Sequence, residues 1–294
     1  MKKIKKYLKN NKKTWFNLNK HPIKVKRQKY EQNGEVVYTF NYKTSIKKLI
    51  IYITKYFKLY HTLKKCLLYT NFKKDFLRFK KFSKKDNRFN INWKDKYPCL
   101  YNNTEKTKFD AHYIYHPAWA ARILTKTKPS KHIDISSSLH FCSLISAFVP
   151  VEFYDFRPAE LNLSNLITKK GDVTSLPFES KSIKSLSCMH TIEHIGLGRY
   201  GDKLDPEGDL KAIKELKRVL AINGNLLFVV PVGKPKIMFN AHRIYSYNQI
   251  VEYFNDFELK DFSLITDKGD FIQNSNKETS DNQKYGCGCF WFKK

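Results

Sequence analysis

Three consecutive serines, Ser136 to Ser138, follow the short apolar run His132–Ile135 and precede a second apolar run. This order is typical of a strand that turns into a loop around a nucleotide, although such loops are usually built from glycine. Asp155 lies 21 residues after Asp134, close to the spacing at which an acid holds the ribose of a bound ligand. A carboxylate there accepts hydrogen bonds from both ribose hydroxyls. The two segments together predict a site for a ligand that contains a nucleoside.

Two further segments end apolar runs with polar residues. The segment "GDVTSLPF" contains Asp172, which suits an adenine amino group. The segment "CMHTIEHIGLGRYGD" contains Glu193 and His194. Two interpretations of His194 stay open: it packs at a helix start with its ring bonded to the backbone, or it acts as a general base, because its ordinary pKa suits neutral conditions.

The loop "GLGRYGDKLDPEG" places charged residues beside four glycines. Arg199, Tyr200, Asp202 and Asp205 all fall within it. Arginine offers a bidentate fork and aspartate pairs with hydroxyls, so this composition predicts a polar ligand such as a sugar or a phosphate ester.

Arginine is scarce, at 8 of the 55 basic residues, so its positions are informative. Arg157, Arg199 and Arg243 follow the second, fourth and fifth predicted strands. A guanidinium binds anions in a way that lysine does not, which predicts a shared ligand edge. The alternative is that the three arginines fall at these positions by chance.

These residues need a scaffold that brings strand ends together. Short apolar runs alternate with helical stretches after about Tyr113, at His132–Ile135, Val151–Phe156, Asn165–Thr168, Ser185–His190, Asn225–Pro231, Leu259–Ile265 and Phe290–Phe292. The alternation predicts an α/β fold with a doubly wound, mostly parallel, Rossmann-like sheet, and the last two runs suit an antiparallel edge pair. A helix with one apolar face, from Leu210 to Leu220, is expected to end at Asn223-Gly224. Ligands of such sheets bind beyond the carboxyl ends of the strands.

The first hundred residues differ from the rest. They carry 29 Lys or Arg against 5 Asp or Glu, whereas residues 101–294 carry 26 against 22. We expect a basic N-terminal extension over 1–100, with a hairpin at Asn33-Gly34 and amphipathic helices, and an α/β domain over 113–294. The helix either packs on that domain or rests on an anionic membrane surface. The excess of lysine over arginine, without aromatic stacking patterns, argues against nucleic acid.

The six cysteines predict neither disulfides nor a metal site. Cys142 and Cys188 lie in apolar surroundings, as expected of buried thiols in a reducing cytoplasm. The pair Cys287 and Cys289 lacks a second cysteine or histidine pair at a suitable spacing. The N-terminus has no apolar core of a secretory signal, and lysines interrupt the most apolar stretch too often for a membrane span.

The motifs in this order resemble a class I S-adenosylmethionine-dependent methyltransferase over roughly residues 130–294. More narrowly, "FYDFRP", "SIKSLSCMHTIEHIGLGRYGD", "DPEGDLKAIKELKRVL" and "FNAHRIYS" resemble an uncharacterised methyltransferase-like family, domain of unknown function 268. The resemblance implies S-adenosylmethionine as cofactor and assigns cofactor contacts to Asp134, Ser136, Ser138, Asp155, Asp172, Val173 and His190. Where the family pattern has Gly-x-Gly, this chain has serines, which weakens that expectation.

The remaining candidates belong to the acceptor side. Catalytic roles are expected of His194, Arg199 and His242, and acceptor binding of Arg157, Asp202, Asp205, Asn240 and Arg243. The predicted function is methyl transfer to a small or glycan-type polar acceptor in surface polysaccharide metabolism. The alternative is a degenerate scaffold that handles glycans without the cofactor. A protein that binds or modifies RNA ranks last, because only the basic extension suggests it.

Overall fold

The structure is a computed structural model that describes residues 27–32, 35–40, 43–86 and 88–294. The chain divides into two units, residues 1–107 and residues 108–294.

The first unit holds a hairpin and a long helix. The strands β1 (Arg27–Gln32) and β2 (Glu35–Phe40) pair antiparallel, with Gln32 opposite Glu35. The hairpin was predicted at Asn33-Gly34, and these two residues lie outside the described part. The helix α2 (Lys43–Phe82) follows, and Phe72 and Phe76 contact Trp93 with ring centroids 6.0 and 4.9 Å apart. In the described residues, no helix has the length and apolar character needed to cross a membrane.

An eight-stranded sheet forms the centre of the second unit, in the order β11-β10-β12-β7-β6-β3-β4-β5. Its strands are β3 (His132–Ile135), β4 (Val151–Asp155), β5 (Leu166–Lys170), β6 (Ile183–Met189), β7 (Leu220–Val232), β10 (Glu258–Ile265), β11 (Phe271–Ile272) and β12 (Gly286–Lys293). The strands β3 to β7 run parallel, whereas β12 pairs antiparallel with β7 and β10. The predicted Rossmann-like sheet with its antiparallel strands is confirmed.

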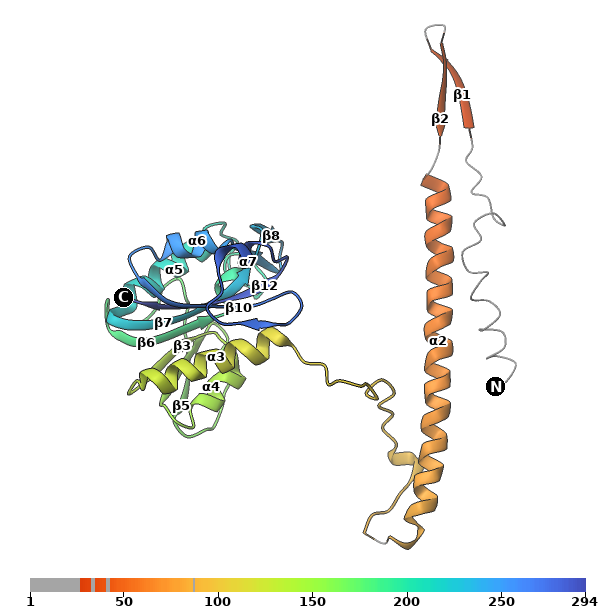
Figure 1. Cartoon of the computed structure of the whole chain (residues 1–294), viewed down its shortest axis with the longest axis horizontal. Coiled ribbons are helices and arrows are strands. Elements are labelled where there is room, and N and C mark those ends of the chain that lie inside the picture. The colour runs from red at the N-terminus through yellow and green to blue at the C-terminus, as the bar shows by residue number, and fades with distance from the viewer. Residues whose placement is uncertain (1–26, 33–34, 41–42, 87) are drawn as a thin grey trace. The chain divides into compact units, whose positions relative to one another are not determined.

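Helices cover both faces of the sheet (Figure 1). On one face lie α3 (Ala111–Thr127) and α4 (Leu139–Ile145), and on the other lie α5 (Gly208–Val219) and α6 (Tyr247–Tyr253). The core under α5 and α6 contains Phe228, Phe254, Phe290 and Phe292, each at most 1% exposed. Burial of each such ring contributes roughly 1.5–3 kcal/mol, so this face anchors the sheet.

The helix α5 ends earlier than its sequence suggested. Its last residue is Val219, and Asn223-Gly224 lies inside β7, where Asn223 has φ 62° and the pairing with β6 shifts register. Both residues bond the chain end: Asn223 N–H donates to the Lys294 carbonyl, and Lys294 N–H donates to the Gly224 carbonyl. The turn-forming pair therefore makes an irregularity in a strand rather than a helix cap. Leu210, expected on the apolar face of α5, is exposed.

The parallel strands bring the predicted polar segments to one edge of the sheet. The carboxyl ends of β3, β4 and β6 are followed by Ser136, Phe156 and His190. Beyond β7, a small antiparallel pair, β8 (Lys236–Met238) and β9 (His242–Ile244), lies beside the 3-10 helix η4 (Ile192–His194). The candidate site is built at this edge.

Candidate functional site

The serine loop after β3 has the backbone of a glycine loop. Ser136 adopts φ 54°, a left-handed conformation that glycine adopts without strain. Its hydroxyl donates to the Tyr154 carbonyl at 3.1 Å, a bond that holds the residue in place. The Ser137 hydroxyl accepts from Met189 N–H at 3.0 Å, and the Ser138 hydroxyl caps α4 by accepting from Phe141 N–H at 3.2 Å. The hydroxyls of Ser137 and Ser138 therefore keep their own protons for a ligand.

Asp134 supports this loop from inside the protein. It is fully buried, and one carboxyl oxygen accepts from Ser137 N–H at 3.0 Å while the other accepts from the Ser187 hydroxyl. Burial raises the pKa of Asp134 to about 6, although the hydrogen bonds from Ser187 and Ser137 oppose the rise. This corrects the expected contact between Asp134 and a cofactor: the side chain positions the loop.

The expected ribose and adenine residues follow β4 and β5. Asp155 is half-buried, and its Oδ1 accepts from Arg157 N–H at 2.7 Å. Asp172 is exposed, and its Oδ1 accepts from the backbone and the hydroxyl of Thr174. In both residues the second carboxyl oxygen is left for a ligand. Val173 packs in the core with only 6% exposure, so it is placed below the loop.

A cavity of about 600 Å³ opens at the carboxyl edge of the sheet. It brings together residues of the serine loop, the end of β6, α3, β9 and the turn that precedes β12. The lining residues are Tyr113, Ser136, Ser137, Ser138, Met189, His190, Glu193, His194, Arg199, Tyr200, Ala241, His242 and Tyr285. Six of the predicted site residues are among them.

His190 and Glu193 form a buried pair at the base of this cavity. His190 Nδ1 lies 2.8 Å from Glu193 Oε1, with the two side chains 4% and 1% exposed. A carboxylate oxygen accepts, so Nδ1 carries the proton and Nε2 carries the lone pair. Nε2 of His190 and Oε2 of Glu193 are both buried and have no hydrogen-bond partner within the part of the chain that is described.

His194 is held in a similar way by the backbone. Its Nδ1 lies 2.7 Å from the Ala241 carbonyl, which can only accept, and 3.2 Å from Arg199 Nη1, which can only donate. The shorter contact, to the carbonyl, places the proton on Nδ1. Its Nε2 is then the basic nitrogen, and it lies 3.8 Å from Glu193 Oε1. Arg199 Nη1 also donates to the Ala241 carbonyl, at 3.0 Å. The bond to the backbone agrees with the packing interpretation, and the role of the other nitrogen as a base stays a prediction.

Aromatic rings make one wall of the cavity. The rings of His112 and Tyr113, at the start of α3, stack on His190 with centroids 5.6 and 5.7 Å apart. Burial first, and then the neighbouring His190, lower the pKa of His112 to about 4. Tyr285 stacks on His112 and also contacts His242, whose Nε2 is buried without a partner among the described residues. Burial lowers the pKa of His242, so this ring is neutral at pH 7.

Two of the predicted acceptor residues instead stabilise their own loop. Asp202 accepts from the N–H groups of Gly196, at 2.7 Å, and Gly198, at 3.3 Å. Asp205 accepts from Glu207 N–H and from Lys211 Nζ. These contacts correct the expected acceptor role, because the carboxylates close a glycine-rich turn.

Arg243 is also a structural residue. It is 5% exposed, and its guanidinium donates to the carbonyls of Ile195, at 2.6 Å, and Pro206, at 3.2 Å. Its Nε lies 3.5 Å from Asp209 Oδ2. The expected acceptor contact of Arg243 is corrected accordingly, since these groups occupy its donors. Asn240 is exposed and does not line the cavity.

Arg157 lies beside the cavity through an aromatic neighbour. Its guanidinium carbon is 4.7 Å from the ring centroid of Tyr200, and that of Arg199 is 5.0 Å from the same centroid. The loops after β4 and β6 thus meet at Tyr200. Two cations at a cavity rim favour an anionic ligand.

The sequence missed several lining residues because they come from distant segments. Glu193 was visible in "MHTIEHI", but its pairing with His190 depends on the turn after β6. Tyr113 and Tyr285 carry no motif at all. They reach the cavity because β12 pairs with β7 and α3 packs on β10 and β12.

A family model matches residues 178–287, and that family is described as "Caenorhabditis protein of unknown function, DUF268". Over these residues the chain is similar to DUF268. The resemblance seen in the sequence is thus confirmed, and the matched segment runs from the residues before β6 into β12. A search of curated proteins finds no match.

Three solved structures to which this chain is similar are described as methyltransferases. A putative methyltransferase of Bacillus halodurans is 12% identical, with a TM-score of 0.44, over 60% of this chain and 97% of its own. The 1,6-didemethyltoxoflavin-N1-methyltransferase of Burkholderia thailandensis, solved with S-adenosylhomocysteine, is 10% identical, with a TM-score of 0.44, over 61% and 78%. A possible histamine N-methyltransferase of Thermotoga maritima is 13% identical, with a TM-score of 0.40, over 63% and 92%.

Proposed function

We propose that this protein is an S-adenosylmethionine-dependent methyltransferase that acts on a hydroxyl of a small or glycan-type polar acceptor, in surface polysaccharide metabolism. The observation that carries the proposal is the cavity at the sheet edge. In it the serine loop of β3 faces His194, a histidine whose basic nitrogen the Ala241 carbonyl defines. A ligand loop and a candidate base therefore share one space.

The residues present fit the cofactor. Ser136 keeps the left-handed backbone of the usual glycine, and the free protons of the Ser137 and Ser138 hydroxyls suit a carboxylate. The second oxygen of Asp155 suits ribose hydroxyls, and that of Asp172 suits an amino group. When bound, the cofactor supplies an electrophilic methyl group.

The acceptor side follows from His194 and its neighbours. His194 Nε2 takes the proton of an acceptor hydroxyl, and the Ala241 carbonyl stabilises the resulting imidazolium at Nδ1. The guanidinium groups of Arg157 and Arg199 both lie at the Tyr200 ring, and together they suit a phosphate on the acceptor. Tyr113 and Tyr285 limit access of water from the other side.

A second candidate is a glycan-binding protein that has lost the cofactor. It is favoured by one observation: the Ser136 hydroxyl donates its proton to the Tyr154 carbonyl and so has none to offer a ligand. Direct binding of the cofactor separates the two candidates.

The chemistry is tested by incubating the full chain with radiolabelled S-adenosylmethionine and fractions of nucleotide-linked or lipid-linked sugars. Label is expected in a sugar fraction. The change His194→Gln should lower the rate by about 100-fold or more, the usual contribution of a general base. His140→Gln is the matched control, because His140 is exposed on α4. Cofactor binding with no transfer to any fraction would contradict the acceptor class, and an unchanged rate in His194→Gln would contradict the assigned base.

A further inference from the structure

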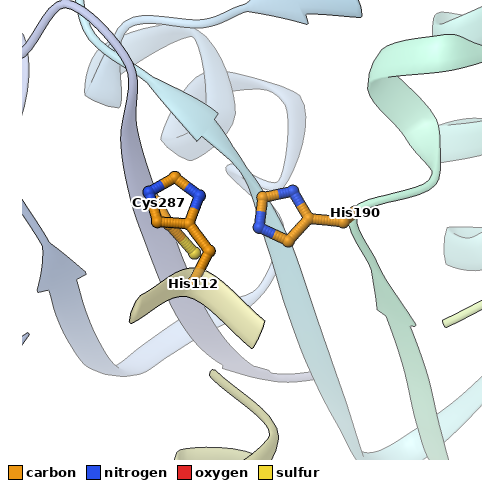
Figure 2. A group of neighbouring side chains, drawn as sticks. All are labelled: His112, His190 and Cys287. Atoms are coloured by element: carbon orange, nitrogen blue, oxygen red, sulfur yellow. The ribbon is translucent and has the colours of Figure 1, made fainter. Parts of the chain in front are cut away.

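Three side chains that bind transition metals converge beside the cavity. They are His112 at the start of α3, His190 after β6 and Cys287 in β12. Their ligand atoms all lie within 4.8 Å of one another. Figure 2 shows the two imidazole rings and the thiol turned toward a common centre. Sequence spacing predicted no metal here, because the three residues come from segments far apart in the chain.

His190 is oriented as a ligand. Its Nδ1 donates to the Glu193 carboxylate at 2.8 Å, which leaves the lone pair on Nε2. That nitrogen is buried and has no hydrogen-bond partner among the described residues. Histidines that bind metals commonly donate their other ring N–H to a carboxylate, which fixes the tautomer and raises the basicity of the ligating nitrogen. A buried nitrogen without a partner is costly in a protein, unless it binds something.

The charges around the three ligands also suit a divalent cation. Glu193 is 1% exposed, and its Oε2 has no hydrogen-bond partner in the described part of the chain. Cys287 is fully buried, and an incoming ion displaces its thiol proton to solvent. A dication, the Cys287 thiolate and the Glu193 carboxylate together are neutral. Such a set avoids the cost of an unbalanced buried charge.

We propose that His112, His190 and Cys287 bind a zinc ion. Two imidazoles and one thiolate are ligands that zinc prefers, and hard cations such as magnesium prefer oxygen. A tetrahedral zinc ion holds its ligand atoms roughly 3.5 Å apart, so the three side chains close in by about an ångström on binding. The half-buried His112 can make that movement, because it lies in the first turn of α3.

We infer that the fourth position of the ion would face the cavity. His190 lines that cavity together with Tyr113 and Tyr285, whose rings lie around the proposed ion. Three protein ligands and one open position are typical of zinc sites that bind water or a substrate oxygen. The ion would therefore contact the acceptor end of the cavity. This proposal does not rest on methyl transfer, and it stands or falls by metal binding alone.

The test uses the full chain, freed of metal by a chelator under reducing conditions, and Co²⁺ as a spectroscopic probe for zinc. Saturable binding of about one Co²⁺ per chain is expected, with thiolate-to-cobalt charge-transfer absorption and d–d bands of tetrahedral strength. Zn²⁺ should displace the Co²⁺ and raise the thermal unfolding midpoint. The absence of both the absorption bands and a shift in the unfolding midpoint would overturn the proposal.

Variants test the individual ligands. Cys287→Ser should abolish the charge-transfer band, and His112→Ala should weaken Co²⁺ binding at least about 100-fold. Glu193→Gln keeps the shape of the side chain and should weaken binding by about 10- to 100-fold. The matched controls are Cys142→Ser, a buried cysteine under α4, and His140→Ala, which is exposed. A full band in Cys287→Ser, or equal losses in the controls, would contradict the assignment.

Misfolding is separated from loss of a ligand by circular dichroism of each variant without metal. His112→Ala is the variant of choice if Cys287→Ser is unfolded, because His112 is half-buried while Cys287 is fully buried. A folded His112→Ala protein that binds Co²⁺ as tightly as the unchanged chain would refute the site.

Discussion

Replacing Arg243 tests whether it supports the fold, as the structure indicates, or binds an acceptor, as its place in the sequence suggested. In Arg243→Ala the carbonyls of Ile195 and Pro206 lose their donors, and Asp209, 5% exposed, keeps only the Tyr245 hydroxyl. Removing one partner of a buried ion pair costs about 3–5 kcal/mol. We expect the free energy of unfolding to fall by that amount.

The assay is urea unfolding at neutral pH, followed by tryptophan fluorescence. Arg122→Ala is the matched control, because Arg122 is exposed and donates only within its own helix. We expect the control to change stability by less than about 0.5 kcal/mol. Arg243→Lys should not restore stability, since an ammonium cannot reach three acceptors in a fork.

Coupling to Asp209 makes the test sharper. The change Asp209→Ala should cost at least about 1 kcal/mol less in the Arg243→Ala background than in the unchanged chain, because the two side chains contact each other. A loss below about 1 kcal/mol for Arg243→Ala, the average effect of a point mutation, would refute the structural role and return Arg243 to the acceptor site.

Three further predictions concern titration and the basic extension. The pKa of Asp134 is raised from 3.8 to about 6 in the folded protein. The unchanged chain should therefore lose up to about 3 kcal/mol of stability as the pH rises from 4 to 6. In urea unfolding, Asp134→Asn should remove most of this dependence of stability on pH. Hydrogen bonds from Lys131 and Lys169 lower the pKa of Glu152 from 4.5 to about 2. Because both lysines are largely exposed, Glu152→Gln should lower the free energy of unfolding by only about 1 kcal/mol at pH 7. This difference in stability between the variant and the unchanged chain should vanish as the pH falls toward 2. Residues 108–294 should fold alone, with cooperative thermal unfolding, and the full chain should pellet with anionic liposomes in a salt-dependent way that the truncated chain lacks.

The fold could be predicted from the sequence because its signals are local. The apolar runs found β3 and β10 to within one residue, and the alternation with helices gave the parallel sheet. The prediction at Asn223-Gly224 was wrong because such a pair makes a turn both at the end of a helix and within a strand. Only the pairing of β7 with β6 and with the chain end shows that the turn lies within a strand.

The site could be predicted only in part. The serine loop, His190, His194 and Arg199 reach the cavity because the carboxyl ends of parallel strands share an edge. Arg243 lies at that edge too, but its side chain turns to buried carbonyls, which no spacing reveals. The approach of Cys287 to the end of β6 depends on β12 pairing with β7, a contact between residues about 60 apart in the chain.

The central claim, that the cavity binds a nucleoside cofactor, is tested most directly by titration calorimetry of the full chain with S-adenosylhomocysteine. We expect saturable binding with a Kd well below about 1 mM, where the binding free energy is only about 4 kcal/mol. Asp155→Ala should weaken it at least about 10-fold without changing the thermal midpoint, and Glu179→Ala, which also removes a carboxylate but before the amino end of β6, should leave it unaltered. No heat of binding to the folded, unchanged chain at millimolar ligand would contradict the claim.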